Sequence, residues 1–172
     1  MTSAALKEII FGDLERELKV TRKVLAALPL KEFDWKVHEK SMSLGQLAIH
    51  VATLPEWAMD ALAHDVLDFA TAPKPPKRVA DTAELLKLFD DKCAGLRAAV
   101  EAFDPEQWHE DWTIRNGDKV FTTQQRSKVF RIWSLNHLVH HRAQLCVYLR
   151  LLGVGVPTVY FNTSDDPAWV FD

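Results

Sequence analysis

The stretch from Ser134 to Leu145 reads Ser-Leu-Asn-His-Leu-Val-His-His-Arg-Ala-Gln-Leu and lies within the longest helical pattern of the chain. His137 and His141 are four residues apart, so on a helix they lie one turn apart on the same face. That spacing allows two imidazoles to reach one metal ion. Two ligands rarely hold a metal alone, and His50, which faces inward on another apolar helical stretch, is the best candidate for a third. The pattern predicts a helical bundle that binds a metal.

Length and composition bound the class of protein. The chain has 172 residues, enough for a single domain covering residues 1–172, and its 48% hydrophobic and 26% charged residues are typical of soluble globular proteins. The net charge of −3 and the lack of a basic stretch argue against a nucleic-acid partner. No apolar run approaches the roughly 20 residues of a membrane span, and the N-terminus does not read as a signal peptide. We therefore expect a cytoplasmic protein with no membrane contact.

The two cysteines are consistent with a cytoplasmic location. Cys93 and Cys146 fall on different predicted helices and look like small buried apolar residues of a reducing compartment. We expect both to be free thiols.

Periodic apolar residues predict four helices, at about residues 3–28, 43–63, 81–103 and 122–152. Capping patterns mark the starts of the last three: Ser43 with Gln46, Asp81 with Glu84, and Thr122 with Gln125. The proline-rich segment 71–77 cannot be helical, and it is long enough to cross one end of a bundle. This favours a crossover order over a simple up-down-up-down arrangement.

Two segments depart from the helical texture. Residues 112–121, with Asn116-Gly117 at their centre, read as a short β-hairpin before the last helix. After Gly153 the chain is irregular but keeps apolar residues that we expect to pack on the body or on a partner chain: Val156, Val159, Tyr160, Phe161 and Trp169. The predicted fold is all-α, a four-helix bundle with crossover topology, a short hairpin and an irregular C-terminal tail.

The histidines also have a plainer interpretation. Each could be a core residue satisfied by a neighbouring carbonyl or hydroxyl group, because a pair of histidines four residues apart is common by chance. Three histidines on inward faces favour a cation, since converging neutral imidazoles are hard to explain without one. Leu138 stands where a zinc protease of the HExxH type has its catalytic Glu, which argues against a peptidase. The catalytic residues stay unknown, and Asn136, His140 and Tyr148 are only nearby polar candidates.

Three stretches match a known pattern in order and spacing: residues 42–52 followed by Trp57, residues 136–150, and residues 156–160. They resemble the DinB-like (YfiT-related) superfamily of metal-binding four-helix bundles. The resemblance implies helices in a crossover order, a metal site at His50, His137 and His141, and often a homodimer. After Tyr160 the chain reads Phe-Asn-Thr-Ser where family members often have a Gly-Pro-Ser-like stretch, which affects substrate class more than fold.

Three neutral histidines match the ligand count of catalytic zinc, with a position left open. Zinc or nickel fits these ligands best, and iron, cobalt and manganese are the alternatives. The resemblance implies a metal-dependent enzyme like the thiol-dependent S-transferases and isomerases that use low-molecular-weight bacterial thiols. The alternatives are a metal-dependent hydrolase, a non-enzymatic dimer that binds a metal or small ligand, and a bundle whose histidines are structural.

Overall fold

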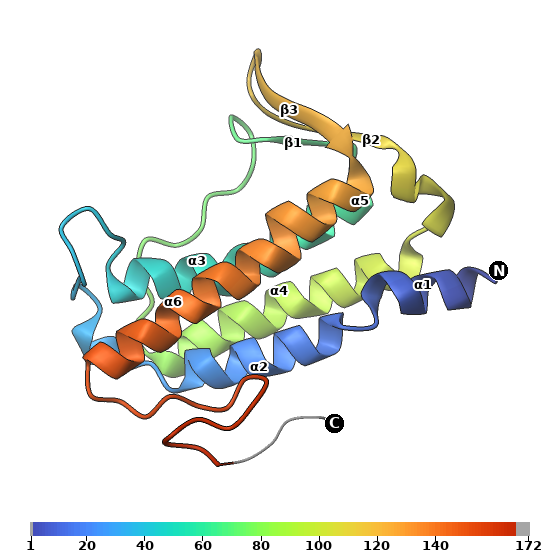
Figure 1. Cartoon of the computed structure of the whole chain (residues 1–172). Coiled ribbons are helices and arrows are strands. Elements are labelled where there is room, and N and C mark those ends of the chain that lie inside the picture. The colour runs from blue at the N-terminus through green and yellow to red at the C-terminus, as the bar shows by residue number, and fades with distance from the viewer. Residues whose placement is uncertain (1, 168–172) are drawn as a thin grey trace.

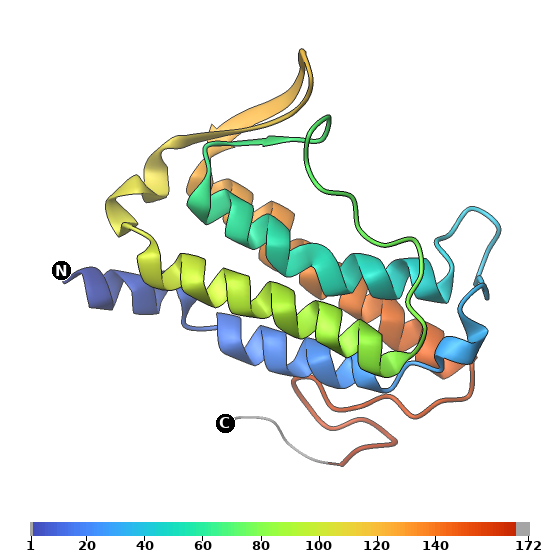
Figure 2. The same ribbon diagram turned by 180° about the vertical axis from the view of Figure 1, so that it is seen from behind.

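The computed structural model describes residues 2–167 of the chain. Four long helices, α2 (Leu14–Ala26), α3 (Leu44–Ala63), α4 (Thr82–Ala102) and α6 (His137–Leu151), form a bundle around an apolar core (Figure 1). Helix α2 packs against α4 and α6, and α3 packs against the same two helices. Helices α3 and α4 run in the same direction. The segment that connects them in the sequence, residues 64–81, therefore returns along the length of the bundle (Figure 2). The predicted four-helix bundle with a crossover is confirmed.

The predicted caps of the second and third helices are confirmed. Ser43 and Gln46 form a reciprocal capping box at the start of α3, and the carboxylate of Asp81 accepts the amide of Glu84 at the start of α4. The link before α3, which contains the short 3₁₀ turn η1 (Leu30–Glu32), lays the buried ring of Phe33 on Gly45. A Cβ atom at position 45 would overlap that ring, so glycine permits the close approach.

The first predicted helix, residues 3–28, is in fact two helices. Helix α1 (Ser3–Phe11) ends at Gly12, and α2 begins after Asp13. Glycine and aspartate both have low helix propensity, which the apolar periodicity of this stretch concealed. The break places Phe11 in a cluster of edge-to-face rings with Phe103, Trp108 and Phe130.

A small sheet covers one end of the bundle. Strands β2 (Asp111–Asn116) and β3 (Lys119–Gln125) form the predicted hairpin, although its turn residues are Gly117 and Asp118, one position later than expected. Gly117 supplies the positive φ that the turn requires. A third strand, β1 (Val66–Asp68), pairs in parallel with β2 and was not predicted, because three residues carry too little pattern.

The predicted cap at Thr122 and Gln125 is wrong. Both residues belong to β3, since the Val-Phe-Thr-Thr run has a strong preference for strands and pairs with β2. The last helical stretch begins at Arg126 with α5 (Arg126–Val129), continues through the π-helical segment η3 (Phe130–Asn136) and ends with α6. The short 3₁₀ helix η2 (Pro105–His109) connects α4 to the sheet.

The C-terminal tail packs on the bundle as far as it is described. Val156 and Val159 lie against the core, and the Tyr160 hydroxyl donates to the carboxylate of Glu17 on α2 at 2.9 Å. Phe161 is 59% exposed, and Trp169 lies outside the described residues. Cys93 and Cys146 are free thiols, as predicted. Within residues 2–167 the helices fall short of the length and apolar character that crossing a membrane demands.

Candidate metal centre

The structure brings the three predicted ligands together. His50 lies in the first half of α3, while His137 and His141 stand one turn apart at the start of α6. One nitrogen from each ring lies within 4.8 Å of the corresponding nitrogen in the other two rings, and the Nε2 atoms of His50 and His137 are 3.2 Å apart. His50 and His137 are 87 residues apart in the sequence, so the packing of α3 against α6 forms a site that neither helix could form by itself.

Two of the rings are oriented through their Nδ1 atoms. Nδ1 of His137 donates to the carbonyl oxygen of Trp133 at 3.2 Å, and Nδ1 of His141 donates to Oε1 of Gln144 at 2.7 Å. Since Nδ1 carries the proton in both rings, Nε2 is the free ligand nitrogen. Such outer contacts of the ring are typical of metal-binding histidines.

The π-helical segment η3 explains the contact of His137. In a regular α-helix the carbonyl of Trp133 would accept the amide of His137. Here that amide donates to the carbonyl of Ser134 instead, so the carbonyl of Trp133 can accept the proton of the imidazole ring. Single π-helical turns are frequent at functional sites.

Burial keeps the three imidazoles neutral. Burial, followed by the neighbouring charges of His141 and His137, lowers the pKa of His50 to about 4. Burial also lowers the pKa of His137 and of His141. Neutral imidazole is the form that binds a metal, so at pH 7 this donor set fits a divalent ion of intermediate softness. The group formed by His50, His137 and His141 could hold a metal ion.

A cleft of about 270 Å³ reaches this group at His50, one of the three histidines. One wall is the face of α3 that carries His50, and the other is the segment from Leu67 to Pro75. Trp57 stands in the cleft, with its ring centroid 6.3 Å from that of His50 and 5.5 Å from that of His137. The cleft therefore gives a small molecule a route to His50.

The other polar candidates have different roles. His140 is exposed, and its Nε2 accepts from the amide of Gln144 at 3.2 Å. Tyr148 is buried and donates to the carbonyl of Met42, which ties α6 to the link before α3. Asn136 is exposed and precedes α6. Sequence reasoning missed Gln144, although its position three residues after His141 on a helix is the signal that could have identified it.

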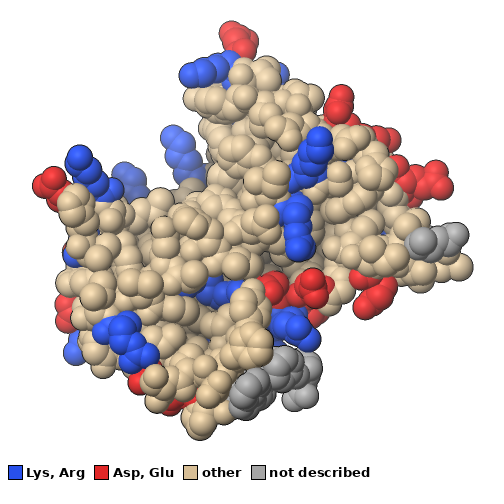
Figure 3. Space-filling view, viewed as in Figure 1, with Lys and Arg blue, Asp and Glu red and all other residues tan. Residues whose placement is uncertain are grey.

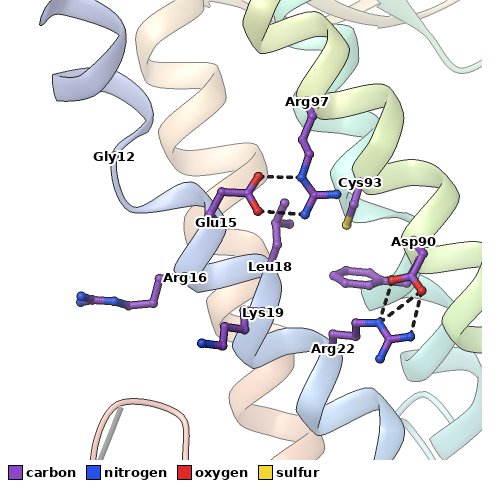
Figure 4. A pocket seen from close by; sticks show the side chains of 10 residues that line it. Gly12, Glu15, Arg16, Leu18, Lys19, Arg22, Asp90, Cys93 and Arg97 are labelled. Atoms are coloured by element: carbon purple, nitrogen blue, oxygen red, sulfur yellow. Dashed lines mark hydrogen bonds and ion pairs between the residues drawn. The ribbon is translucent and has the colours of Figure 1, made fainter. Parts of the chain in front are cut away.

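A larger cleft of about 560 Å³ lies elsewhere, between α2 and α4 (Figure 4). The ion pairs Arg22–Asp90 and Arg97–Glu15 bridge the two helices across it, at 2.8 and 2.7 Å. Burial raises the pKa of Cys93 at its base to about 12, so this thiol is a poor nucleophile. These contacts give the larger cleft a structural role in joining α2 to α4.

Comparisons with known proteins agree with the fold. The DinB family model matches residues 3–169, and no curated protein sequence matches the chain. A DinB-like protein from Bacillus cereus has a crystal structure that covers 88% of this chain and 95% of its own, with 20% identity and a TM-score of 0.69. A DinB-like protein from Bacillus subtilis covers 84% and 91%, with 18% identity and a TM-score of 0.64.

A third solved structure, of a protein from Exiguobacterium sibiricum described as a possible member of the same family, covers 89% of this chain and 94% of its own. Its identity is 18% and its TM-score is 0.60. At these identities the structures establish a common fold, and the family match over residues 3–169 establishes the membership. The chain belongs to the DinB family.

Proposed function

We propose that this protein is a divalent-metal-dependent enzyme whose metal is held by His50, His137 and His141. The observation that carries the proposal is the convergence of three neutral imidazoles, one of which, His50, lines a cleft. Zinc or nickel is the preferred ion on ligand type, and iron, cobalt and manganese are the alternatives. A divalent ion with three imidazole ligands lowers the pKa of a water or thiol bound at its open position, and so supplies a nucleophile at neutral pH.

The reaction that we propose first is transfer of a low-molecular-weight thiol to an electrophile, or isomerisation assisted by such a thiol. Its support is the family resemblance together with the affinity of soft thiolates for zinc. Hydrolysis is the second candidate, because the same site suits activation of water. In either reaction the chain's own residues hold the ion and guide the substrate past Trp57.

A purely binding role has less support. A tail that closed the site would favour a storage or binding protein. The described part of the tail instead contacts α2, through the hydrogen bond of Tyr160 with Glu17 and the ion pair of Asp166 with Lys23 at 3.6 Å. The cleft at His50 is lined by α3 and residues 67–75, with no contribution from the described tail. This arrangement supports an enzyme.

Elemental analysis of protein purified without added metal or chelator tests the site. We expect about one equivalent of zinc or nickel per chain in the wild type, and its loss in the His50→Ala, His137→Ala and His141→Ala variants. His140→Ala is the matched control, because it removes an exposed histidine beside the site and should retain the metal. Retention of metal in all three ligand variants, with unchanged thermal stability, would exclude the site.

A panel of bacterial thiols with electrophilic acceptors tests the reaction. We expect turnover that depends on the added metal and disappears in His137→Ala but persists in His140→Ala. Metal-dependent hydrolysis of esters or amides without turnover of thiols would favour the second candidate. A protein that binds metal but turns over neither class would support the binding role.

A further inference from the structure

We propose that the cleft beside the histidines takes a small molecule with a protonated amine, and that Asp60 is the carboxylate that binds this amine. The inference rests on the proposed function in so far as it names the chemical class of substrate for the same site. Three observations support the inference: the shape of the cleft, the pairing of the charges along it and its aromatic walls.

The cleft has a long axis along α3. His50, Thr53, Trp57 and Asp60 line it at intervals of three, four and three residues, which places them on one face of the helix. At 1.5 Å per residue, Asp60 lies about 15 Å from His50 along the helix axis. A ligand of that length could therefore reach His50 at one end and Asp60 at the other.

The charges along this face are unevenly paired. Glu56 binds Lys92 of α4 at 2.5 Å, so its charge is compensated. The side chain of Asp60 is only 19% exposed, and within residues 2–167 its ion-pairing contact is the ring of His64 at 3.4 Å, with no lysine or arginine within 4.0 Å. Lys92 also acts on Asp60 electrostatically, but its ammonium group binds Glu56. Burial raises the pKa of Asp60. A carboxylate that is removed from water without a permanent cation gains most from a cationic ligand.

The opposite wall does not supply this cation. Lys74 lies there in the proline-rich segment, but it is exposed and forms no ion pair among the described residues. Water can therefore solvate its ammonium group, and Asp60 stays available to a ligand.

Aromatic rings line the cleft between its two ends. The rings of Trp57 on α3 and Phe69 on the opposite wall both line it, and they pack against each other with centroids 5.6 Å apart. Phe121 of β3, which lies outside the lining, packs on Phe69 with centroids 6.2 Å apart. Such faces pack against an apolar or aromatic skeleton and attract a nearby ammonium group. Aromatic walls next to a carboxylate without a permanent cation are the combination that recognises an amine.

Three probes of matched skeleton test the inference: 2-phenylethylamine, 2-phenylethanol and phenylacetate, titrated calorimetrically into the full-length protein with and without zinc. We expect the amine to bind at least about tenfold more tightly than the alcohol, because a charge-assisted hydrogen bond is stronger than a neutral one. The preference should disappear in Asp60→Asn and persist in Asp91→Asn, which removes an exposed carboxylate of α4.

The outcomes separate this inference from the proposed function. Equal binding of amine and alcohol to the wild type, or tighter binding of phenylacetate, would overturn the inference whatever the variants do. An amine preference that survives in Asp60→Asn would overturn the role of Asp60. The probes need no metal, so an amine preference in a protein that binds no zinc would support this inference while the proposed function fails.

Discussion

Gln144 determines which nitrogen of His141 faces the other two histidines. Its Oε1 accepts Nδ1–H of that ring at 2.7 Å, and its amide group donates to His140 at 3.2 Å. Gln144→Ala should therefore lower the affinity for zinc about tenfold or more, as changes at such outer contacts do. A competition titration with a chromophoric chelator measures this change.

Two further variants make the Gln144 experiment specific. Gln144→Glu keeps an oxygen acceptor for Nδ1–H and should restore the affinity. Gln107→Ala, an exposed glutamine of η2, should leave it unchanged. If Gln144→Ala binds zinc as tightly as the wild type, the contact does not position His141.

The carboxylate of Asp60 should lower the stability of the folded protein at neutral pH. Burial raises its pKa in the folded state, so the folded state retains a proton at pH values where the unfolded chain, with a pKa near 4, has lost it. Stability therefore falls as the pH rises through that window. Asp60→Asn should be more stable than the wild type at pH 7, within about 1 kcal/mol, and the difference should shrink toward pH 4.

Thermal melts of Asp60→Asn at several pH values check this prediction, with Asp91→Asn as the control. A variant that is less stable than the wild type at pH 7 would contradict it. If Asp60→Asn is more stable than the wild type, the result agrees with a functional role for Asp60, since functional sites often retain groups that destabilise the fold.

At the scale of elements, Arg126 joins the end of α3 to the start of α5. Arg126 is 1% exposed, and its guanidinium donates to the carbonyls of Ala61 and His64, both at 2.6 Å, and to the carboxylate of Asp65 at 2.7 Å. It thereby satisfies carbonyls at the C-terminus of α3 that lack partners within the helix.

Arg126→Met should destabilise the fold by about 3 kcal/mol, because it leaves buried carbonyls without donors. Urea denaturation measures the loss. Arg131→Met is the control, since Arg131 is an exposed residue of η3 and its replacement should change stability by less than about 0.5 kcal/mol. Equal midpoints for the two variants would show that the buried arginine does not stabilise this junction.

At the scale of the whole molecule, a homodimer stays a prediction. The face of η3 and α6 toward the viewer in Figure 3 carries few charges along its middle. Elements η3 and α6 carry four exposed apolar residues, each between 39% and 56% exposed: Ile132, Trp133, Val147 and Leu151. Exposed apolar patches of this kind often mark contacts between chains.

We expect light scattering to give the mass of a dimer at micromolar concentration, and Val147→Lys with Leu151→Lys to give a monomer, since two charges would have to be buried. Val66→Lys, at an exposed valine of β1, is the matched control and should leave the mass unchanged. A monomeric wild type would contradict the dimer.

Local patterns account for what was predictable. The caps at Ser43 and Asp81 depend on residues within three positions, and the pairing of His137 with His141 depends on one helical turn. These features follow from the sequence because the groups that interact are neighbours along the chain. The failures are also local, since Gly12 and Asp13 interrupt a helix and residues 122–125 prefer strand to helix.

The sequence by itself therefore determined the helical class, the crossover and the three candidate ligands. The three-dimensional structure alone decided what surrounds them: the carbonyl of Trp133 that the π-helical segment leaves to orient His137, the third strand, and the cleft between α3 and residues 67–75. The physical reason is that these contacts depend on backbone geometry and on segments distant in sequence. Periodicity reports which face of a helix is buried, and only packing decides which groups meet there.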